Sequence, residues 1–178
     1  LFILLLLASG SLNNAFSQQK MELVIPKGHT GSVKNLLATK DGQYLISGGS
    51  DLVNVFDIFK NKLLKSFSLK VNGESSDALQ MAFNKLQNKV AIATYKGIFL
   101  INLDDLSLTT IPFDKAETLV FSANGNSLYT AGRYGAYEIN IASFKASQLF
   151  NSAAREFINA KLSKDGKKVF FAGEKKLY

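Results

Sequence analysis

Short apolar runs separated by turn residues recur along the chain about every 8 to 12 residues, which is the pattern of an all-β protein. No helical periodicity accompanies them. The first runs are Val33 to Ala38, Tyr44 to Ser47, Leu52 to Phe56 and Leu63 to Leu69. Four runs of this length, joined by short turns, predict a four-stranded antiparallel meander.

The set of runs is repeated along the chain. Tyr44 to Asp57 aligns with Lys89 to Asn102, then with Ser127 to Asn140 and Lys168 to Tyr178, at successive offsets of 45, 38 and 41 residues. The counterparts of the first run are Ala78 to Phe83, Ala116 to Phe121 and Phe157 to Leu162. A period of this size indicates a repeat architecture, in which neighbouring copies stack to bury the faces that one meander leaves exposed.

The turn between the first and second runs has a recurring composition. The four copies have Asp41-Gly42, Gln87-Asn88, Asn124-Gly125 and Asp165-Gly166 at this place. Gly and Asn accept the positive φ that tight connections between antiparallel strands require. The sequence therefore predicts a positive φ in each of these turns.

Several residues of the first copy carry a family resemblance. Gly28-His29 at its start, Asp41-Gly42, Ser47-Gly48 with Asp51 nearby, and Phe56-Asp57 at the end of the third run resemble a WD repeat. The similarity covers Val24 to Tyr178 and is strongest in the first copy; the chain resembles secreted bacterial WD-repeat proteins. It implies an all-β propeller of four-stranded antiparallel blades, present here as an incomplete arc of three blades plus part of a fourth that continues beyond residue 178.

The resemblance also implies structural roles for repeat residues. In the family, a His, a Ser or Thr, an Asp and a Trp form a hydrogen-bonded network within a blade, and His29, Ser47 and Asp51 are the nearest matches. Phe56 holds the Trp position and has no N–H to donate. Asp57, Asn102 and Asn140 close the third strands of successive copies. In the family, a blade and a sequence repeat do not begin at the same residue, and the segment before the first repeat supplies the outer strand of the last blade. The resemblance therefore implies that Glu22 to Pro26 forms this outer strand.

The start of the sequence has the features of a secretory signal peptide. LFILLLLA is an apolar segment, and Ala15-Phe16-Ser17 offers the small residues of a cleavage site before Gln18. We expect residues 1–17 to be a truncated signal peptide, 18–22 a short linker and 23–178 the partial propeller. The expected location is exported, periplasmic or extracellular. The alternative is a membrane anchor, although eight apolar residues fall short of the roughly 20 that a span needs, so no integral span is expected in the mature chain.

Composition narrows the class of partner. The chain of 178 residues has a net charge of +7, from 21 Lys and Arg against 14 Asp and Glu. The basic residues are spread along the sequence, whereas nucleic-acid binding would call for a basic stripe or a known motif. A protein or peptide partner is therefore expected, and no nucleic acid.

Sequence signatures of catalysis are missing. One His and no Cys leave too few ligands for a transition-metal site, and no cofactor motif occurs. Asp104-Asp105 follows a strand and is more typical of a solvated turn than of an acid/base pair. We expect a non-enzymatic binding scaffold. Two alternatives stay open: a targeting module of a larger enzyme such as a caspase-like peptidase, and a propeller hydrolase with an axial site.

The turns between the second and third runs are the candidate binding face. In a WD-type propeller these turns meet at one end, and here they contain Ser50-Asp51, Tyr95-Lys96, Arg133-Tyr134 and Glu174-Lys175. Tyr and Arg are enriched at binding hot spots. The candidate residues are Tyr95, Lys96, Arg133, Tyr134 and Lys175. The alternative is that such turns expose polar residues without binding anything.

Overall fold

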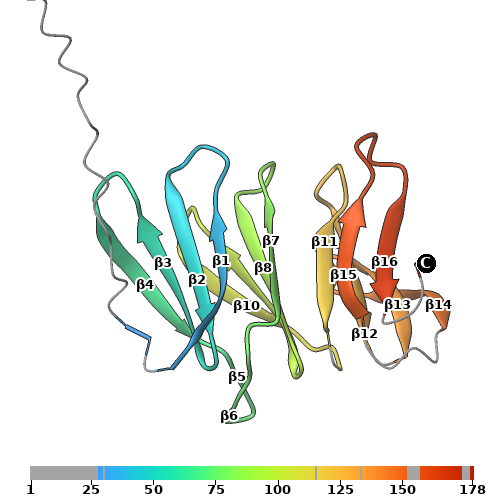
Figure 1. Cartoon of the computed structure of the whole chain (residues 1–178), viewed down its shortest axis with the longest axis horizontal. Coiled ribbons are helices and arrows are strands. Elements are labelled where there is room, and N and C mark those ends of the chain that lie inside the picture. Colours follow the sequence, from blue (N-terminus) through green and yellow to red (C-terminus); the bar gives the residue numbers. More distant parts are fainter. Residues whose placement is uncertain (1–27, 30, 115, 133, 152–156, 174–176) are drawn as a thin grey trace, which may run out of the picture.

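The chain forms an open arc of antiparallel β-sheets that stand side by side (Figure 1). The computed structural model describes residues 28–29, 31–114, 116–132, 134–151, 157–173 and 177–178. Strands and turns make up these residues, and no helix occurs among them. The prediction of an all-β fold built from four-stranded antiparallel blades is confirmed.

Three sheets have four strands each, in sequence order from one edge to the other. Blade 1 consists of β1 (Val33–Ala38), β2 (Tyr44–Gly49), β3 (Leu52–Asp57) and β4 (Lys62–Ser68). Blade 2 consists of β7 (Gln80–Asn84), β8 (Lys89–Thr94), β9 (Gly97–Asn102) and β10 (Ser107–Ile111). Blade 3 consists of β11 (Thr118–Phe121), β12 (Ser127–Gly132), β13 (Gly135–Asn140) and β14 (Ala146–Asn151).

A further sheet, blade 4, contains β15 (Phe157–Leu162) and β16 (Val169–Gly173). A bridge between Ala172 and Leu177 begins the pairing of a third strand, as the aligned repeat predicts. The first strands of adjacent blades pack against each other in the order β1, β7, β11, β15. These strands line the inner side of the arc, and the fourth strands lie on its outer side (Figure 1).

The core lies between the blades. Alternate side chains of β8 point to opposite faces of the sheet, as in any strand. Val90 and Ile92 belong to the cluster shared with blade 1, whereas Ala91 and Ala93 belong to the cluster shared with blade 3. A third cluster, which includes Phe157 and Phe171, joins blades 3 and 4. Because both faces of blade 2 are covered, its two middle strands, β8 and β9, are nearly continuous buried apolar runs.

Amide side chains on the first strands join different blades at the inner side of the arc: blade 1 to blade 2, blade 2 to blade 3, and blade 2 to blade 4. Asn35 Nδ2 donates to the carbonyl oxygen of Ala78 at 2.6 Å. Gln80 Oε1 accepts from the Leu119 N–H at 2.8 Å, and Gln80 Nε2 donates to Asn159 Oδ1 at 3.1 Å. Asn35, Gln80 and Asn159 occupy the same position in their repeats. The blades are therefore held in register by directed bonds as well as by apolar packing.

The turns between first and second strands have the predicted positive φ. The values are 71° at Gly42, 48° at Asn88, 73° at Gly125 and 70° at Gly166. In blade 1, Thr39 Oγ1 donates to Asp41 Oδ1 at 2.5 Å, and the Gln43 N–H donates to the same oxygen at 3.1 Å. These hydrogen bonds lower the pKa of Asp41, because they favour the ionised carboxylate.

Copies three and four repeat this turn with matching chemistry. Ser122 Oγ donates to Asn124 Oδ1 at 2.8 Å, and Ser163 Oγ donates to Asp165 Oδ1 at 2.6 Å. The Ser163 hydroxyl, followed by the Lys167 N–H, lowers the pKa of Asp165. The same turn is thus closed by a carboxylate in blades 1 and 4 and by a neutral amide in blade 3.

A short hairpin that the apolar pattern did not predict lies between blades 1 and 2. It consists of β5 (Lys70–Val71) and β6 (Glu74–Ser75), joined by Asn72 and Gly73 with φ of 52° and 82°. Two successive positive φ values are characteristic of the type I′ hairpin turn. The hairpin accounts for the longer first offset of the repeat.

Candidate functional site

The blades present two opposite ends with different turns. We call one the tyrosine end: it carries the β2–β3, β8–β9 and β12–β13 turns together with the β5–β6 hairpin, and lies at the bottom of Figure 1. We call the other the lysine end: it carries the turns between first and second strands and between third and fourth strands, and lies at the top.

Two tyrosines of adjacent blades are exposed at the tyrosine end. Tyr95, in the β8–β9 turn, is 50% exposed, and Tyr134, in the β12–β13 turn, is 53% exposed. The turn at Tyr134 ends in Gly135 with φ of 126°, and a Cβ there would lie 2.1 Å from the carbonyl oxygen of Phe150. Only glycine fits that position, so the backbone that presents Tyr134 is fixed by the sheet.

Charged residues of the tyrosine end form two ion pairs. Lys96 Nζ forms an ion pair with the Glu74 carboxylate of the β5–β6 hairpin. Lys34 Nζ pairs with Asp77 Oδ2 at 2.5 Å. Both pairs are partly exposed, so each contributes little to stability. Their effect is to balance positive and negative charge at this end.

A small pocket lies beside Tyr134. It has a volume of about 140 Å³ and is lined by Tyr134, Gly132, Phe113, Asp114 and Tyr137. The rings of Phe113 and Tyr137 meet edge to face, with centroids 5.2 Å apart. Gln148 Nε2 donates to the Tyr134 carbonyl oxygen at 3.1 Å, and this bond links β14 to the turn at the edge of the pocket. The arrangement offers an aromatic hollow with one carboxylate at its edge.

The structure places three of the five candidate face residues at one end. Tyr95, Lys96 and Tyr134 all lie at the tyrosine end, whereas Arg133 and Lys175 lie outside the described residues. The sequence did not single out Glu74 or the pocket residues Phe113 and Tyr137. Only the β5–β6 turn gives a signal for Glu74, since the Asn72-Gly73 dipeptide is typical of a hairpin.

The repeat residues lie within the blades. His29 Nε2 and Ser47 Oγ are 2.8 Å apart, so a hydrogen bond joins the entry of blade 1 to β2. Asp51 is half-buried, and among the described residues no hydrogen bond joins its side chain to His29. Phe56 is buried. The bonded set in blade 1 is therefore a His–Ser pair.

The residues that end the third strands cap the turns that follow. Asp57 Oδ1 accepts from the Lys60 N–H at 2.9 Å, which lowers the pKa of Asp57. Asn102 Oδ1 accepts from the Asp104 N–H at 3.1 Å, and Asn140 Oδ1 from the Ala142 N–H at 3.1 Å. Asp57, Asn102 and Asn140 thus share one structural role.

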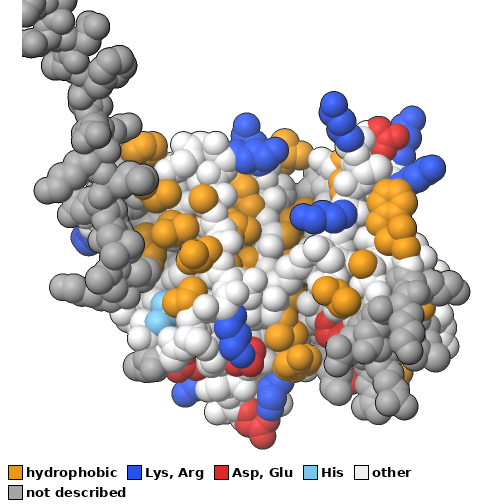
Figure 2. All heavy atoms as spheres, in the orientation of Figure 1, with side chains coloured by type: hydrophobic (Ala, Val, Ile, Leu, Met, Phe, Trp, Pro, Cys, Tyr) orange, Lys and Arg blue, Asp and Glu red, His pale blue; other side chains and the backbone are white. Residues whose placement is uncertain are grey.

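Lysines gather at the lysine end, as Figure 2 shows along its upper edge. The described lysines there are Lys40, Lys60, Lys62, Lys85, Lys89, Lys145, Lys164, Lys167 and Lys168, and the described aspartates are Asp41, Asp57, Asp104, Asp105 and Asp165. Lys60 pairs with Asp57 at 3.3 Å; the other lysines of this set form no ion pair with a described residue. The aspartates instead accept bonds from their own turns, as at Asp41 and Asp165.

No metal site is evident in the described part of the chain: no three His, Cys, Asp or Glu side chains there lie close enough to share an ion. None of the described segments is a helix of the length and apolar character needed to span a membrane.

Sequence comparisons give no family assignment. No protein-family model matches the chain, and no curated protein matches it.

Solved structures of low sequence identity resemble it, among them WD40 propellers. U3-55K and the WD40 repeats of RRP9 are each 20% identical, with TM-scores of 0.68, and a chain of the mitotic checkpoint complex is 13% identical, also with a TM-score of 0.68. The alignments cover 83%, 83% and 84% of this chain and 47%, 46% and 47% of those chains. Hydrazine synthase of Kuenenia stuttgartiensis is 14% identical with a TM-score of 0.67, over 83% of this chain and 44% of that one. The chain spans less than half the length of these relatives, and its fold is that of WD40 propeller blades.

Proposed function

We propose that this protein is a non-enzymatic scaffold that binds a protein or peptide at the tyrosine end of its blades. The partner's contact surface centres on Tyr134 and the pocket beside it. Tyr95 and Lys96 of the adjacent blade extend the same surface, and Arg133 precedes Tyr134 in the sequence.

The observation that carries the proposal is the exposure of two tyrosines on fixed turns of neighbouring blades. Tyrosine is enriched at binding hot spots, because burial of its ring supplies much of the energy of an interface. Tyr134 is 53% exposed although its turn is fixed by Gly135 and Phe150. The pocket of Phe113 and Tyr137 provides the concave part that an anchoring side chain needs.

Propeller neighbours support the class of function. One neighbour is a chain of the mitotic checkpoint complex. A platform of stacked blades offers several turns at one end, so a partner can contact more than one blade at once. The neighbours show the fold alone, and the choice of the tyrosine end rests on this chain's own residues.

Export is part of the proposal and rests on the sequence. Signal peptidase would cleave after Ser17, because Ala15 and Ser17 supply the small side chains of its site. Mass spectrometry of the protein from the culture medium or periplasm should find Gln18 as the N-terminus. A cell-bound protein that retains the Leu-rich segment would support a membrane anchor instead.

The binding surface is tested in the complete protein with a photo-crosslinking amino acid at Tyr95 or Tyr134. Its partner should be captured from either position, and not from Lys62, which is exposed on β4 at the lysine end. With that partner, Tyr134→Ala should weaken binding by about 2 kcal/mol, as expected for a hot spot, while Lys62→Ala changes it little.

Lys65 is a poor control because its ammonium donates to the Leu106 carbonyl oxygen at 2.7 Å and so joins two blades. Circular dichroism of each variant checks the fold. Equal loss at Tyr134 and Lys62 would indicate general attraction rather than a defined surface, and no loss at Tyr134 would remove the tyrosine end from the proposal.

A further inference from the structure

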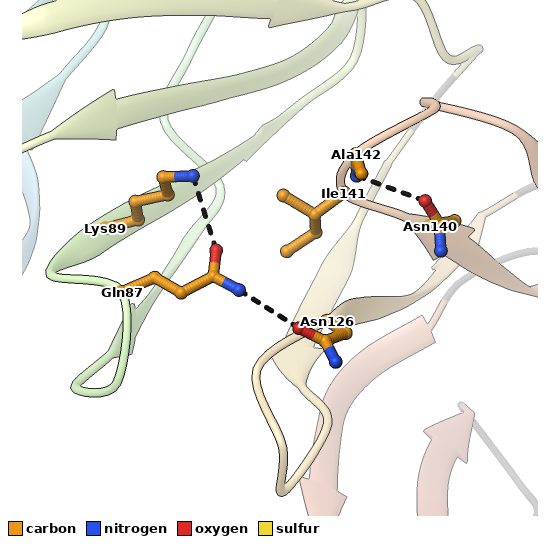
Figure 3. A pocket seen from close by; sticks show the side chains of 6 residues that line it. All are labelled: Gln87, Lys89, Asn126, Asn140, Ile141 and Ala142. Atoms are coloured by element: carbon orange, nitrogen blue, oxygen red, sulfur yellow. Dashed lines mark hydrogen bonds between the residues drawn. The ribbon is translucent and has the colours of Figure 1, made fainter.

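A second and larger pocket lies at the lysine end, in the groove between blades 2 and 3. Its volume is about 350 Å³, within the range of small-ligand sites. Blade 2 contributes Gln87 and Lys89, and blade 3 contributes Asn126, Asn140, Ile141 and Ala142 (Figure 3). Figure 3 shows the polar side chains of the two blades facing each other across the hollow, with Ile141 between them.

The pocket contains a positive charge that lacks an acidic partner. Lys89 Nζ donates to Gln87 Oε1 at 3.3 Å, and this neutral oxygen is its partner in the described part of the chain. Gln87 Nε2 in turn donates to Asn126 Oδ1 at 3.2 Å across the two blades. An ammonium and amide groups on an apolar floor form a site suited to a carboxylate, which could accept from Lys89 at close range.

The walls of the pocket are held by buried bonds. Asn84, which is buried, donates through Nδ2 to the Gly125 carbonyl oxygen at 2.9 Å and accepts from the Gln87 N–H at 3.3 Å. The Ile141 N–H donates to the Asn126 carbonyl oxygen at 3.0 Å. Both turns are fixed before any ligand arrives, which lowers the ordering cost of binding.

The surroundings of the pocket suit a peptide rather than a free acid. The turn that carries Gln87 also carries Leu86, which is 71% exposed, and the turn that carries Ala142 also carries Phe144, which is 39% exposed. Lys85 and Lys145 lie in the same two turns. Apolar and basic side chains on both sides of the pocket match a segment in which acidic and apolar residues alternate.

We propose that the pocket of Gln87, Lys89, Asn126 and Ile141 binds an acidic peptide segment, with a Glu or Asp carboxylate of the peptide on Lys89. The site is separate from the tyrosine end and independent of the function proposed for it. Neighbouring lysines of the lysine end attract the segment, and Leu86 and Phe144 contact its apolar residues.

The test uses the complete protein and a fluorescein-labelled peptide of alternating Glu and Leu, followed by anisotropy at about 0.15 M salt, where charges outside the pocket are screened. The matched peptide has Gln in place of Glu and should bind at least about tenfold more weakly. Lys89→Gln should weaken binding of the Glu peptide by about tenfold, because a charge-assisted bond is lost. Lys40→Gln, on blade 1 at the same end, removes the same charge outside the pocket and should change binding less than about twofold.

A second variant shows whether loss of binding in Lys89→Gln comes from the pocket or from a change in the fold. Ala142 is exposed, and Ala142→Glu places a carboxylate of the chain itself at the pocket; this variant should keep its thermal melt and lose peptide binding. Equal weakening by Lys89→Gln and Lys40→Gln, equal binding of both peptides, or no binding of the Glu peptide would overturn the proposal. Competition by free glutarate at the peptide's own affinity would also overturn it, since the pocket would then take a small carboxylate.

Discussion

The two ends of the blades use their charged residues in opposite ways. At the tyrosine end, acidic side chains face lysines across neighbouring segments, as in the Lys96–Glu74 and Lys34–Asp77 pairs. At the lysine end, Asp41 and Asp165 accept hydrogen bonds from their own turns, and Lys60–Asp57 is the one ion pair among the described lysines of this end. One end therefore presents aromatic rings among balanced charges, and the other presents uncompensated positive charge.

This difference shows how one repeated framework can offer two kinds of surface. The turns of the lysine end need Asp or Asn at fixed positions, because the side chain closes the turn. At the tyrosine end, the β8–β9 turn is closed by the Thr94 hydroxyl, which donates to the Gly97 carbonyl oxygen and accepts from the Lys96 N–H, so the exposed Tyr95 ring takes no part in that closure. Variation at these positions changes the surface without changing the blade.

The largest expected loss of stability is at a glycine of the tyrosine end that has no room for a side chain; a glycine of the lysine end that has room serves as the comparison. Gly135→Ala should destabilise the complete protein by about 3 kcal/mol, because its Cβ would overlap the Phe150 carbonyl oxygen at a φ of 126°. Gly42→Ala, with φ of 71° and no atom within 4 Å of a Cβ, should lower the free energy of unfolding by only about 1 kcal/mol. Urea unfolding measures both. Similar losses would mean that the tight approach at Gly135 does not fix its turn.

The next effect concerns the bond between blades 2 and 3. Asn84→Ala removes a buried amide that bonds Gly125 and two N–H groups of its own turn, and should cost about 2 kcal/mol in unfolding free energy. Asn126→Ala, on the exposed side of the same groove, should cost less than about 0.5 kcal/mol. Equal costs in thermal or urea unfolding would show that the inter-blade contact does not depend on the buried amide.

Low pH should destabilise the fold by protonating the aspartates that close turns at the lysine end. The pKa of Asp41 and of Asp165 is lowered in the folded chain, so each stabilises the fold above its unfolded pKa of about 3.9, and this contribution is lost as pH falls through the folded value. Asn can accept the same bonds without titrating, as Asn124 does in blade 3. The double variant Asp41→Asn, Asp165→Asn should therefore lose less stability between pH 5 and about pH 2.

Asn124→Asp provides the reciprocal variant. It should add acid sensitivity to blade 3, because the introduced carboxylate would accept from Ser122 and from the Asn126 N–H. Urea unfolding at a series of pH values measures all three proteins. An unchanged pH slope in both the double variant and Asn124→Asp would contradict the assignment of these turns as acid-sensitive.

The smallest effect is expected at the tyrosine end. Glu74→Gln removes the ion pair with Lys96, whose partners are both partly exposed, and should change the unfolding free energy by about 0.5 kcal/mol or less. The change should shrink further at high salt. A loss as large as that of Asn84→Ala would show that the exposed Lys96–Glu74 pair stabilises the fold as much as a buried amide does, which would contradict this account.

The blades could be predicted from the sequence because their signal is local and repeated. β1 and β15 have the bounds of the predicted runs, and Gly42, Asn88, Gly125 and Gly166 have the positive φ that their turns required. The β5–β6 hairpin was missed because two-residue strands are too short to form an apolar run. Its Asn72-Gly73 turn was the available signal.

The site could be predicted only in part. The common end of Tyr95, Lys96 and Tyr134 follows from topology, since the turns of aligned strands point the same way. The pairing of Lys96 with Glu74 depends on how the hairpin folds back. The pocket at Lys89 forms between turns of two blades, and its Gln, Asn and Ala residues have no sequence signature of binding.

The central claim is that a protein partner occupies the tyrosine end. Hydrogen–deuterium exchange of the complete protein, with and without the partner captured at Tyr134, tests it most directly. The account predicts slower exchange in the β8–β9 and β12–β13 turns and unchanged exchange in the β3–β4 and β9–β10 turns of the lysine end. Protection confined to the lysine end, with the turns at Tyr95 and Tyr134 unchanged, would contradict it.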